Sequence, residues 1–144
     1  MNAVQQPGKL LVVGSVNMDL VFQTSQLPSP GETVIGSSFC QVHGGKGANQ
    51  AVAAARGSNV PVKLFAAVGG DGYATSIMES FKLESRLSVA LIQQVADAAT
   101  GVAVIMVDDQ GENMICVAAG ANERLSSELV EAVANSVFEQ ACVV

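Results

Sequence analysis

The sequence contains no tryptophan, and aromatic residues make up only 4% of its 144 positions. Charged residues are also few, at 14%, and no cluster of lysine or arginine occurs along the chain, which argues against a nucleic-acid-binding surface. No apolar run reaches the roughly 18 residues that a membrane-spanning helix needs. The polar N-terminal residues do not form a signal peptide. We therefore expect a soluble protein with no nucleic-acid partner and no membrane association.

Cysteine is scarce as well, and its spacing excludes several kinds of site. The three cysteines are Cys40, Cys116 and Cys142, an odd number with no CxxC pair and no metal-ligand spacing. The sequence therefore predicts no metal site of its own. Reduced thiols in a cytoplasmic protein are the expected state.

What the sequence has in quantity is small apolar residues. Hydrophobic residues reach 49%, glycine occurs 14 times, and the net charge is -6. This composition is typical of a globular protein, and the length suits one domain with a substantial core. Because alanine and valine must do most of the packing, we expect close contacts between helices and a sheet.

Apolar β-branched runs alternate with helical patterns along most of the chain. The predicted buried strands cover residues 9–16, 61–69 and 87–95, with a further strand starting at Ala141. The predicted helices cover residues 47–57, 73–85 and 125–138. Ser126 or Ser127 is expected to cap the last helix. Its apolar stripe is formed by Leu129, Val130, Val133 and Val137. Such alternation is typical of an α/β fold with a largely parallel sheet.

Two further pairs of strands do not fit this alternation. They lie at about 19–42 and 100–119, with a turn at 27–32 in the first pair and a hairpin loop at 108–112 in the second. We expect them to form a small antiparallel sheet attached to the main one. The sequence stops just after the strand at Ala141 begins, which would leave a sheet edge exposed. We therefore expect the chain to be part of a longer protein or a truncated product.

The segment HGGKGANQAVAAA, at residues 43–55, has the look of a phosphate-binding loop. A Walker A loop requires Ser or Thr after its lysine, but Gly47 follows Lys46, and the GxGxxG fingerprint of dinucleotide-binding domains is absent. The glycines instead allow close backbone approach, and a helix starting near Gly47 would offer free N–H donors. With the Lys46 and Asn49 side chains, these groups suit a neutral molecule with many hydroxyls. A tight turn with a solvated lysine is the alternative.

A second polar motif, GSVNMD at residues 14–19, follows the first predicted strand. Ligands of open α/β sheets bind beyond the carboxyl ends of the strands. Asn17 and Asp19 are two residues apart, so in an extended segment their side chains point the same way. An amide and a carboxylate together can hold vicinal hydroxyls. The alternative is that both residues simply form a turn.

These motifs, together with PSPGETV, ATGVAVIMV and AAGAN, resemble in order and spacing the ribokinase family of sugar kinases, from about Leu10 to the end. The resemblance implies a three-layer α/β/α fold with a mostly parallel central sheet and a β-sheet lid, of which residues 1–144 are the N-terminal part, incomplete at the C-terminal end. It implies ATP-dependent phosphorylation of the 5-hydroxyl of D-ribose in the complete enzyme, with Mg2+ and K+. It also implies a homodimer formed through the lids.

The resemblance assigns roles to individual residues. Asn17, Met18 and Asp19 match one sugar-binding motif, and a second is matched by Gly45, Lys46, Gly47, Ala48 and Asn49. Asp19 would accept hydrogen bonds from ribose hydroxyls, and Lys46 and Asn49 would donate to ribose oxygens. Met18 is bulkier than expected there and would reshape the pocket. The lid positions over the sugar are Ala103, Ile105 and Val117, for which plain sheet packing is the alternative.

The catalytic part of such an enzyme is missing from the sequence. The family's Gly-Ala-Gly-Asp motif, which supplies the base and the phosphate-binding helix start, does not occur. In AAGAN, Asn122 stands where a base would be, but an amide cannot take a proton, so no catalytic role is assigned to it. His43, the only histidine, is expected to be solvated or in a turn.

Three alternatives to a ribose kinase remain open at this point. The chain could be an inactive sugar-binding or dimerisation module. The complete protein could act on another sugar, such as deoxyribose, or on a nucleoside. A dinucleotide-binding domain is disfavoured because its fingerprint is absent.

Overall fold

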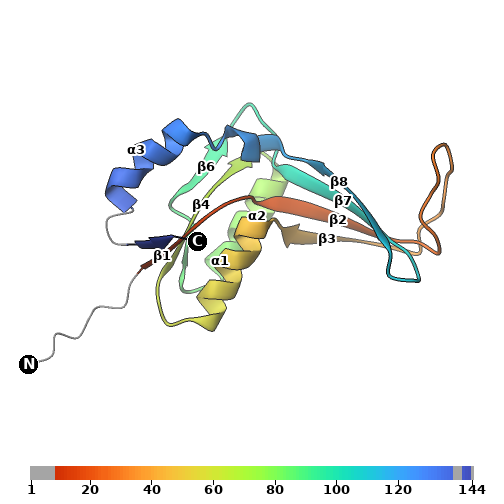
Figure 1. Cartoon of the computed structure of the whole chain (residues 1–144), viewed down its shortest axis with the longest axis horizontal. Helices are drawn as coiled ribbons and strands as arrows, with labels where there is room; N and C mark the ends of the chain where they lie inside the picture. The colour runs from red at the N-terminus through yellow and green to blue at the C-terminus, as the bar shows by residue number, and fades with distance from the viewer. Residues whose placement is uncertain (1–8, 138–140, 144) are drawn as a thin grey trace, which may run out of the picture.

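The computed structural model describes residues 9–137 and 141–143. Two β-sheets make up most of this part of the chain: a main sheet flanked by helices, and a second sheet that extends away from it (Figure 1). Strands pass directly from one sheet to the other, so the junction between them brings together segments that are distant in sequence.

The main sheet is entirely parallel, as its apolar runs predict. Its strands are β1 (Lys9–Val13), β4 (Val62–Gly69), β5 (Leu87–Ser88), β6 (Ile92–Val95) and β9 (Ala141–Val143). Their order is β5-β4-β1-β9, and β6 also pairs with β4. The expected single strand at 87–95 is wrong in one respect: it is divided, so that β5 pairs with the start of β4 and β6 with its end.

Within the described residues, three α-helices and one short 3-10 helix accompany this sheet. They are α1 (Lys46–Gly57), α2 (Gly72–Lys82), α3 (Ser127–Val137) and η1 (Gly120–Arg124). Asp71 caps α2, because its carboxylate accepts a hydrogen bond from the Ala74 N–H at 2.9 Å. The Ser126 hydroxyl accepts the Leu129 N–H at 3.4 Å, which confirms the expected cap of α3.

Both faces of the main sheet are covered. On one face, alternate residues of β4 pack against the alanines of α1 and against Ile77 and Phe81 of α2. On the other face, Leu11 and Phe65 are also fully buried, and α3 lies on the side of the sheet away from α1 (Figure 1). The three-layer α/β/α arrangement expected from the sequence is therefore confirmed. The apolar stripe of α3 is only half covered among the described side chains: Leu129 is 36% exposed.

The second sheet, which we call the lid sheet, consists of β2 (Asn17–Gln23), β3 (Ser38–Gly44), β7 (Gly101–Val107) and β8 (Asn113–Ala118). Its order is β3-β2-β7-β8. The outer pairs are antiparallel, but β2 and β7 are parallel, so the expectation of a purely antiparallel sheet is wrong. Both central strands leave the same end of the main sheet, which makes them run in the same direction.

Strand β3 of the lid sheet also differs from its predicted bounds. The turn expected at 27–32 would place the second strand of this pair from about Glu32, whereas β3 begins at Ser38. Its partner β2 ends at Gln23, which pairs with Ser38, so the preceding residues face no strand. The hairpin loop at 108–112 is confirmed between β7 and β8, where the Asp108 carboxylate accepts the N–H groups of Gln110 and Glu112.

Candidate functional site

A hollow of about 340 Å3 lies at the junction of the main sheet, the start of α1 and the lid sheet. It is lined by residues from three separate segments: Ser15, Asn17, Asp19, Gly45, Lys46, Asn49, Val117, Ala119 and Asn122. In Figure 1, β2 continues the course of β1 into the lid sheet, and α1 begins at the same junction. The two motifs that the sequence singled out therefore meet at one place.

Asn17 and Asp19 reach this hollow because β2 is extended where they lie. Both belong to β2, and residues two apart in a strand share a face of the sheet. Both side chains are half-buried and both line the hollow. The alternative interpretation, in which these residues form a turn, does not agree with the strand that the structure shows.

The Asp19 carboxylate is partly removed from water. It lies against Gly44, where a Cβ atom would overlap the carboxylate in its present position, so the glycine leaves the space that the carboxylate occupies. Burial raises the pKa of Asp19 above its ordinary value, because desolvation disfavours the charged form. Hydroxyl groups that donate hydrogen bonds to an incompletely hydrated carboxylate stabilise its charged form strongly.

The glycines around Lys46 fix the start of α1 against the end of β1. Gly45 has a φ of 95°, a conformation that favours glycine, and Gly47 packs directly on the backbone of Gly14. The Ala48 N–H donates to the Ser15 carbonyl at 3.0 Å, and the Lys46 N–H donates to the Ser15 hydroxyl at 3.2 Å. The expectation that the helix start offers free N–H donors is thus wrong for these two groups, because Ser15 accepts both.

Side chains of the second motif divide between the hollow and the core. Lys46 and Asn49 are exposed and line the hollow, as does Gly45. Gly47 and Ala48 are buried in the contact between α1 and the main sheet. The expectation that Gly47 and Ala48 line the site is therefore wrong: their part is the close packing that places Gly45 and Lys46.

Met18 does not line the hollow. It is only 2% exposed, and it belongs to the buried core on the face of β2 opposite Asn17 and Asp19. Its side chain borders a different hollow, next to Asp71 and Thr100. The expectation that Met18 contacts the sugar and reshapes its pocket is not supported by this geometry, because adjacent residues of a strand point to opposite faces.

Of the three predicted lid contacts, one lines the hollow. Val117 does so, and it is 57% exposed. Ala103 is 5% exposed and lies between Asp19 and Val117 in the lid sheet, as the pairing register shows. Ile105 pairs with Val21, one step further along the same face and away from the hollow. Sheet packing, the alternative reading, is the better description of Ala103 and Ile105.

Asn122 and Ser15 are lining residues that the sequence reasoning missed. Asn122 is not a base, in keeping with its amide, but its side chain is held firmly at the floor of the hollow. Its Oδ1 accepts the Val16 N–H at 2.9 Å, and its Nδ2 donates to the Val16 carbonyl at 3.0 Å, to Asn17 Oδ1 at 2.9 Å and to the Ala119 carbonyl at 2.9 Å. A polar residue in the short segment after β8, at the sheet edge where ligands bind, is the signal that could have found Asn122.

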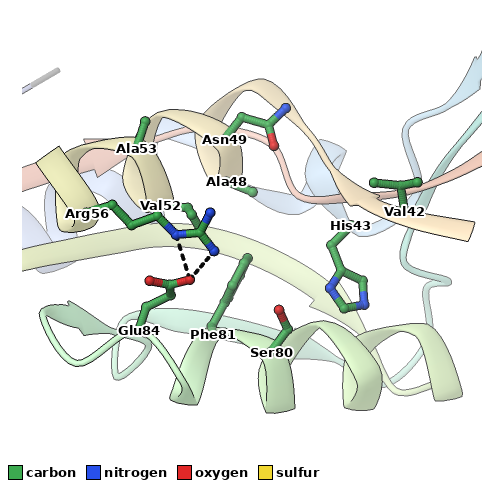
Figure 2. Close-up of a pocket in the computed structure, with 10 residues that line it drawn as sticks. All are labelled: Val42, His43, Ala48, Asn49, Val52, Ala53, Arg56, Ser80, Phe81 and Glu84. Carbon is green, nitrogen blue, oxygen red and sulfur yellow. Dashed lines mark hydrogen bonds and ion pairs between the residues drawn. The ribbon is translucent and has the colours of Figure 1, made fainter.

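A larger hollow of about 440 Å3 lies between α1 and α2 (Figure 2). Arg56 and Glu84 form an ion pair at one end, and at the other the His43 ring lies 3.0 Å from the Ser76 hydroxyl. His43 lies in β3 and its ring is partly exposed, so the expected turn position is wrong, whereas contact with solvent is retained. Because the charged groups here satisfy one another, we place the candidate site at the smaller hollow, where polar groups converge.

Other expectations from the sequence concern groups outside the hollow. Cys40 and Cys116 are free and exposed, while the side chain of Cys142 lies outside the described residues. Across the part of the chain that the structure describes, no group of three or more His, Cys, Asp or Glu side chains is placed to hold a metal ion. No helix within those residues is long and apolar enough to cross a membrane.

Comparisons with known proteins agree with this architecture. The model of the pfkB family carbohydrate kinases matches residues 8–144. A ribokinase of Mus musculus is 42% identical over 124 residues, which cover 86% of this chain and 38% of that protein. The chain thus spans about two fifths of the length of the curated relatives it matches.

Solved structures show the same fold. A ribokinase from Giardia lamblia superposes with a TM-score of 0.84 at 36% identity, covering 95% of this chain and 41% of that one. A ribokinase from Arabidopsis thaliana, solved with ribose and ATP, gives a TM-score of 0.75 at 31% identity, covering 90% and 43%. With the family model matching nearly the whole sequence, the chain belongs to the pfkB family of carbohydrate kinases.

Proposed function

We propose that this chain is the sugar-binding and lid portion of a ribokinase, which transfers the γ-phosphoryl group of ATP to the 5-hydroxyl of D-ribose. The observation that carries the proposal is the convergence of Asn17, Asp19, Lys46 and Asn49 on one hollow. A carboxylate acceptor beside amide and ammonium donors matches a neutral polyol, whose hydroxyls both donate and accept. The ribose complex of the Arabidopsis thaliana relative supports the choice of sugar.

Each lining residue has a distinct part in this proposal. The half-buried Asp19 carboxylate accepts from sugar hydroxyls, and the Lys46 ammonium and Asn49 amide donate to sugar oxygens. Val117 of the lid sheet provides an apolar wall that excludes water from one side of the sugar. Gly45 brings the backbone close enough for the sugar to contact it.

The described residues do not themselves suit a triphosphate. The Lys46 and Ala48 N–H groups at the start of α1 are bonded to Ser15, and no described cluster of carboxylates suits Mg2+. We therefore assign ATP, Mg2+ and K+ to the portion of the relatives that this chain does not span. Since the sequence has no Gly-Ala-Gly-Asp motif, the 144-residue chain alone is expected to form no ribose 5-phosphate.

Calorimetric titration of the chain with D-ribose tests the binding part. Heat of binding is expected for the unaltered chain and for Asp109→Asn, a change of the same kind on the exposed hairpin loop. Asp19→Asn should lower the affinity at least tenfold, because a hydrogen bond to a charged acceptor contributes about 1.5–3 kcal/mol. A flat titration of the folded, unaltered chain would contradict sugar binding.

The identity of the sugar and the catalytic competence of the chain need separate assays. A binding series with D-ribose, 2-deoxy-D-ribose and adenosine distinguishes the ribose proposal from the two alternative substrates, and tighter binding of either competitor would overturn it. Incubation of the chain with ribose, Mg2+, K+ and ATP tests catalysis. Ribose 5-phosphate above a no-protein control would show that the chain contains a complete catalytic site.

We further propose that the protein forms a homodimer through the lid sheet and resides in the cytoplasm. Val42, Ile115 and Val117 share one face of this sheet and are each about half exposed, which is a large apolar area for a solvated strand pair. Light scattering of the chain should give twice the monomer mass, and Ile115→Lys should reduce it to that of a monomer. The exposed thiols of Cys40 and Cys116 support a reducing compartment.

A further inference from the structure

The Asn122 side chain lies at the point where the lid sheet joins the main sheet. Its amide is bonded to the backbone of Val16, just before β2, and to the Ala119 carbonyl, just after β8. A Cβ atom at Gly101, the first residue of β7, would overlap both the Asn122 amide and the Asn17 Oδ1 atom. Three of the four lid strands therefore meet around one side chain.

The bond from Asn122 to Asn17 fixes which way the Asn17 amide faces. Asn122 Nδ2 donates to Asn17 Oδ1 at 2.9 Å. An amide carries its oxygen and its nitrogen on opposite sides of one plane, so Asn17 Nδ2 is turned away from Asn122. Among the described residues no hydrogen bond is found for Asn17 Nδ2, while Asn17 lines the hollow. The free end of the amide is thus its donor end.

This orientation matters because of Asp19, two residues further along the same face of β2. A sugar hydroxyl can donate its hydrogen to the Asp19 carboxylate and accept a hydrogen from Asn17 Nδ2. With the Asn17 amide reversed, two acceptors would face one hydroxyl, which has only one hydrogen to donate. The direction of a single amide therefore decides whether the pair suits a polyol.

We propose that Asn122 is a positioning residue for sugar selection: it holds the Asn17 amide with Nδ2 toward the hollow, as the donor that complements Asp19. The inference rests on the proposed sugar site. Asn122 itself makes no contact with the sugar in this proposal, and it acts only through Asn17.

A double-mutant cycle tests this coupling. D-Ribose affinity is measured by calorimetry for the unaltered chain, Asn122→Ser, Asn17→Ala and the double variant. Asn122→Ser should weaken binding about fivefold to tenfold, as expected for loss of one oriented hydrogen bond. In the double variant Asn122→Ser should add less than twofold to the effect of Asn17→Ala, because Asn122 then has no amide to orient. Equal losses in both backgrounds would show a merely structural role and overturn the proposal.

A matched control and a second variant guard against simple misfolding. Asn113→Ser alters an exposed asparagine in β8, remote from the hollow, and should leave the affinity unchanged. Should Asn122→Ser fail to unfold cooperatively, Asn122→Asp serves instead. It keeps the shape and the bond from the Val16 N–H but places an oxygen opposite Asn17 Oδ1, so it should weaken binding more than Asn113→Asp does.

A readout without sugar separates this inference from the proposed function. The side-chain amide resonances of Asn17, followed by 15N NMR, should shift on Asn122→Ser and stay in place on Asn113→Ser. If the unaltered chain binds no D-ribose, the proposed function fails. If the Asn17 resonances do not change in Asn122→Ser, the positioning role fails, whatever the result with ribose. Shifted resonances together with unchanged ribose affinity would overturn the positioning role alone.

Discussion

Replacement of Gly47 by alanine should destabilise the protein because two backbones touch at this position. Gly47 is the second residue of α1 and lies against the segment that follows β1; a Cβ atom there would lie 2.6 Å from the Gly14 carbonyl carbon, 2.7 Å from Gly14 Cα and 2.8 Å from the Ser15 nitrogen. None of these atoms can rotate away, since all are backbone. The start of α1 must therefore move off the end of β1.

The size of the effect follows from what this movement disrupts. Overpacking of a buried contact costs about 1–3 kcal/mol. The shift also strains the bonds from Ala48 N–H to the Ser15 carbonyl and from Lys46 N–H to the Ser15 hydroxyl, each worth about 0.5–1.5 kcal/mol. We expect Gly47→Ala to lower the free energy of unfolding by about 3 kcal/mol. For a domain of this size this corresponds to a fall of about 10 °C in Tm.

Thermal unfolding followed by circular dichroism measures this difference, and Gly57→Ala is the matched control. Gly57 is the last residue of the same helix, and a Cβ atom there would meet nothing within 4 Å. The control should be neutral or raise the free energy of unfolding by about 0.4–1 kcal/mol. If Gly47→Ala unfolds at the same temperature as Gly57→Ala, the argument that α1 is held by glycine-to-glycine contact is refuted.

Three further predictions concern Asp71, Asp19 and the cysteines. Burial raises the pKa of Asp71, but hydrogen bonds from Thr100 and Ala74 lower it by more, so the net shift of the pKa is downward. Asp71→Asn should therefore reduce the free energy of unfolding at pH 7, and this deficit should shrink as the pH falls below about 4. Urea unfolding at several pH values measures the difference. Because the pKa of Asp19 is raised by burial, its ionised form opposes folding, and Asp19→Asn should raise the Tm of the sugar-free chain at pH 7, with the gain vanishing at low pH. Ellman's reagent should modify Cys116 in the folded chain without denaturant, and Cys40 as well once Ile115→Lys has separated the proposed dimer, because Cys40 shares the face of Val42 and Ile115.

Each of these expectations has a definite contrary outcome. A stability deficit of Asp71→Asn that is independent of pH would show that the charge of the hydrogen-bonded Asp71 carboxylate does not stabilise the folded chain. A lower Tm for Asp19→Asn would show that its charge is compensated in the folded chain. A Cys116 thiol that does not react would contradict its exposure, and a Cys40 thiol that reacts fast without Ile115→Lys would contradict its shielding by the proposed dimer.

Much of the fold could be predicted from local pattern. The buried parallel strands β1 and β4 follow from β-branched runs, and α1 follows from alanines that end at Gly57. The predictions fail where pairing partners decide the outcome. The strand expected at 87–95 divides because its two halves meet different parts of β4, and β3 begins late because β2 has already ended.

The candidate site shows the same division. Asn17 and Asp19 could be placed together from their spacing alone, and Lys46 and Asn49 from the glycine segment beside them. The resemblance places Met18 in the sugar-binding motif together with Asn17 and Asp19, yet alternation in β2 points its side chain into the core. Asn122 was passed over because an amide cannot act as a base, although its part is to hold the Asn17 amide.

By itself, the sequence determined the parallel α/β architecture, the extended Asn17–Asp19 pair and the absence of a Walker A loop, because each depends on neighbours within a few residues. Only the tertiary structure decided that β2 and β7 run parallel, that Ser15 accepts two of the N–H donors at the start of α1, and that Asn122 meets Asn17 across 105 positions. These last features are contacts between distant segments. They depend on how the lid sheet and the main sheet are joined, which sequence patterns within a few residues do not predict.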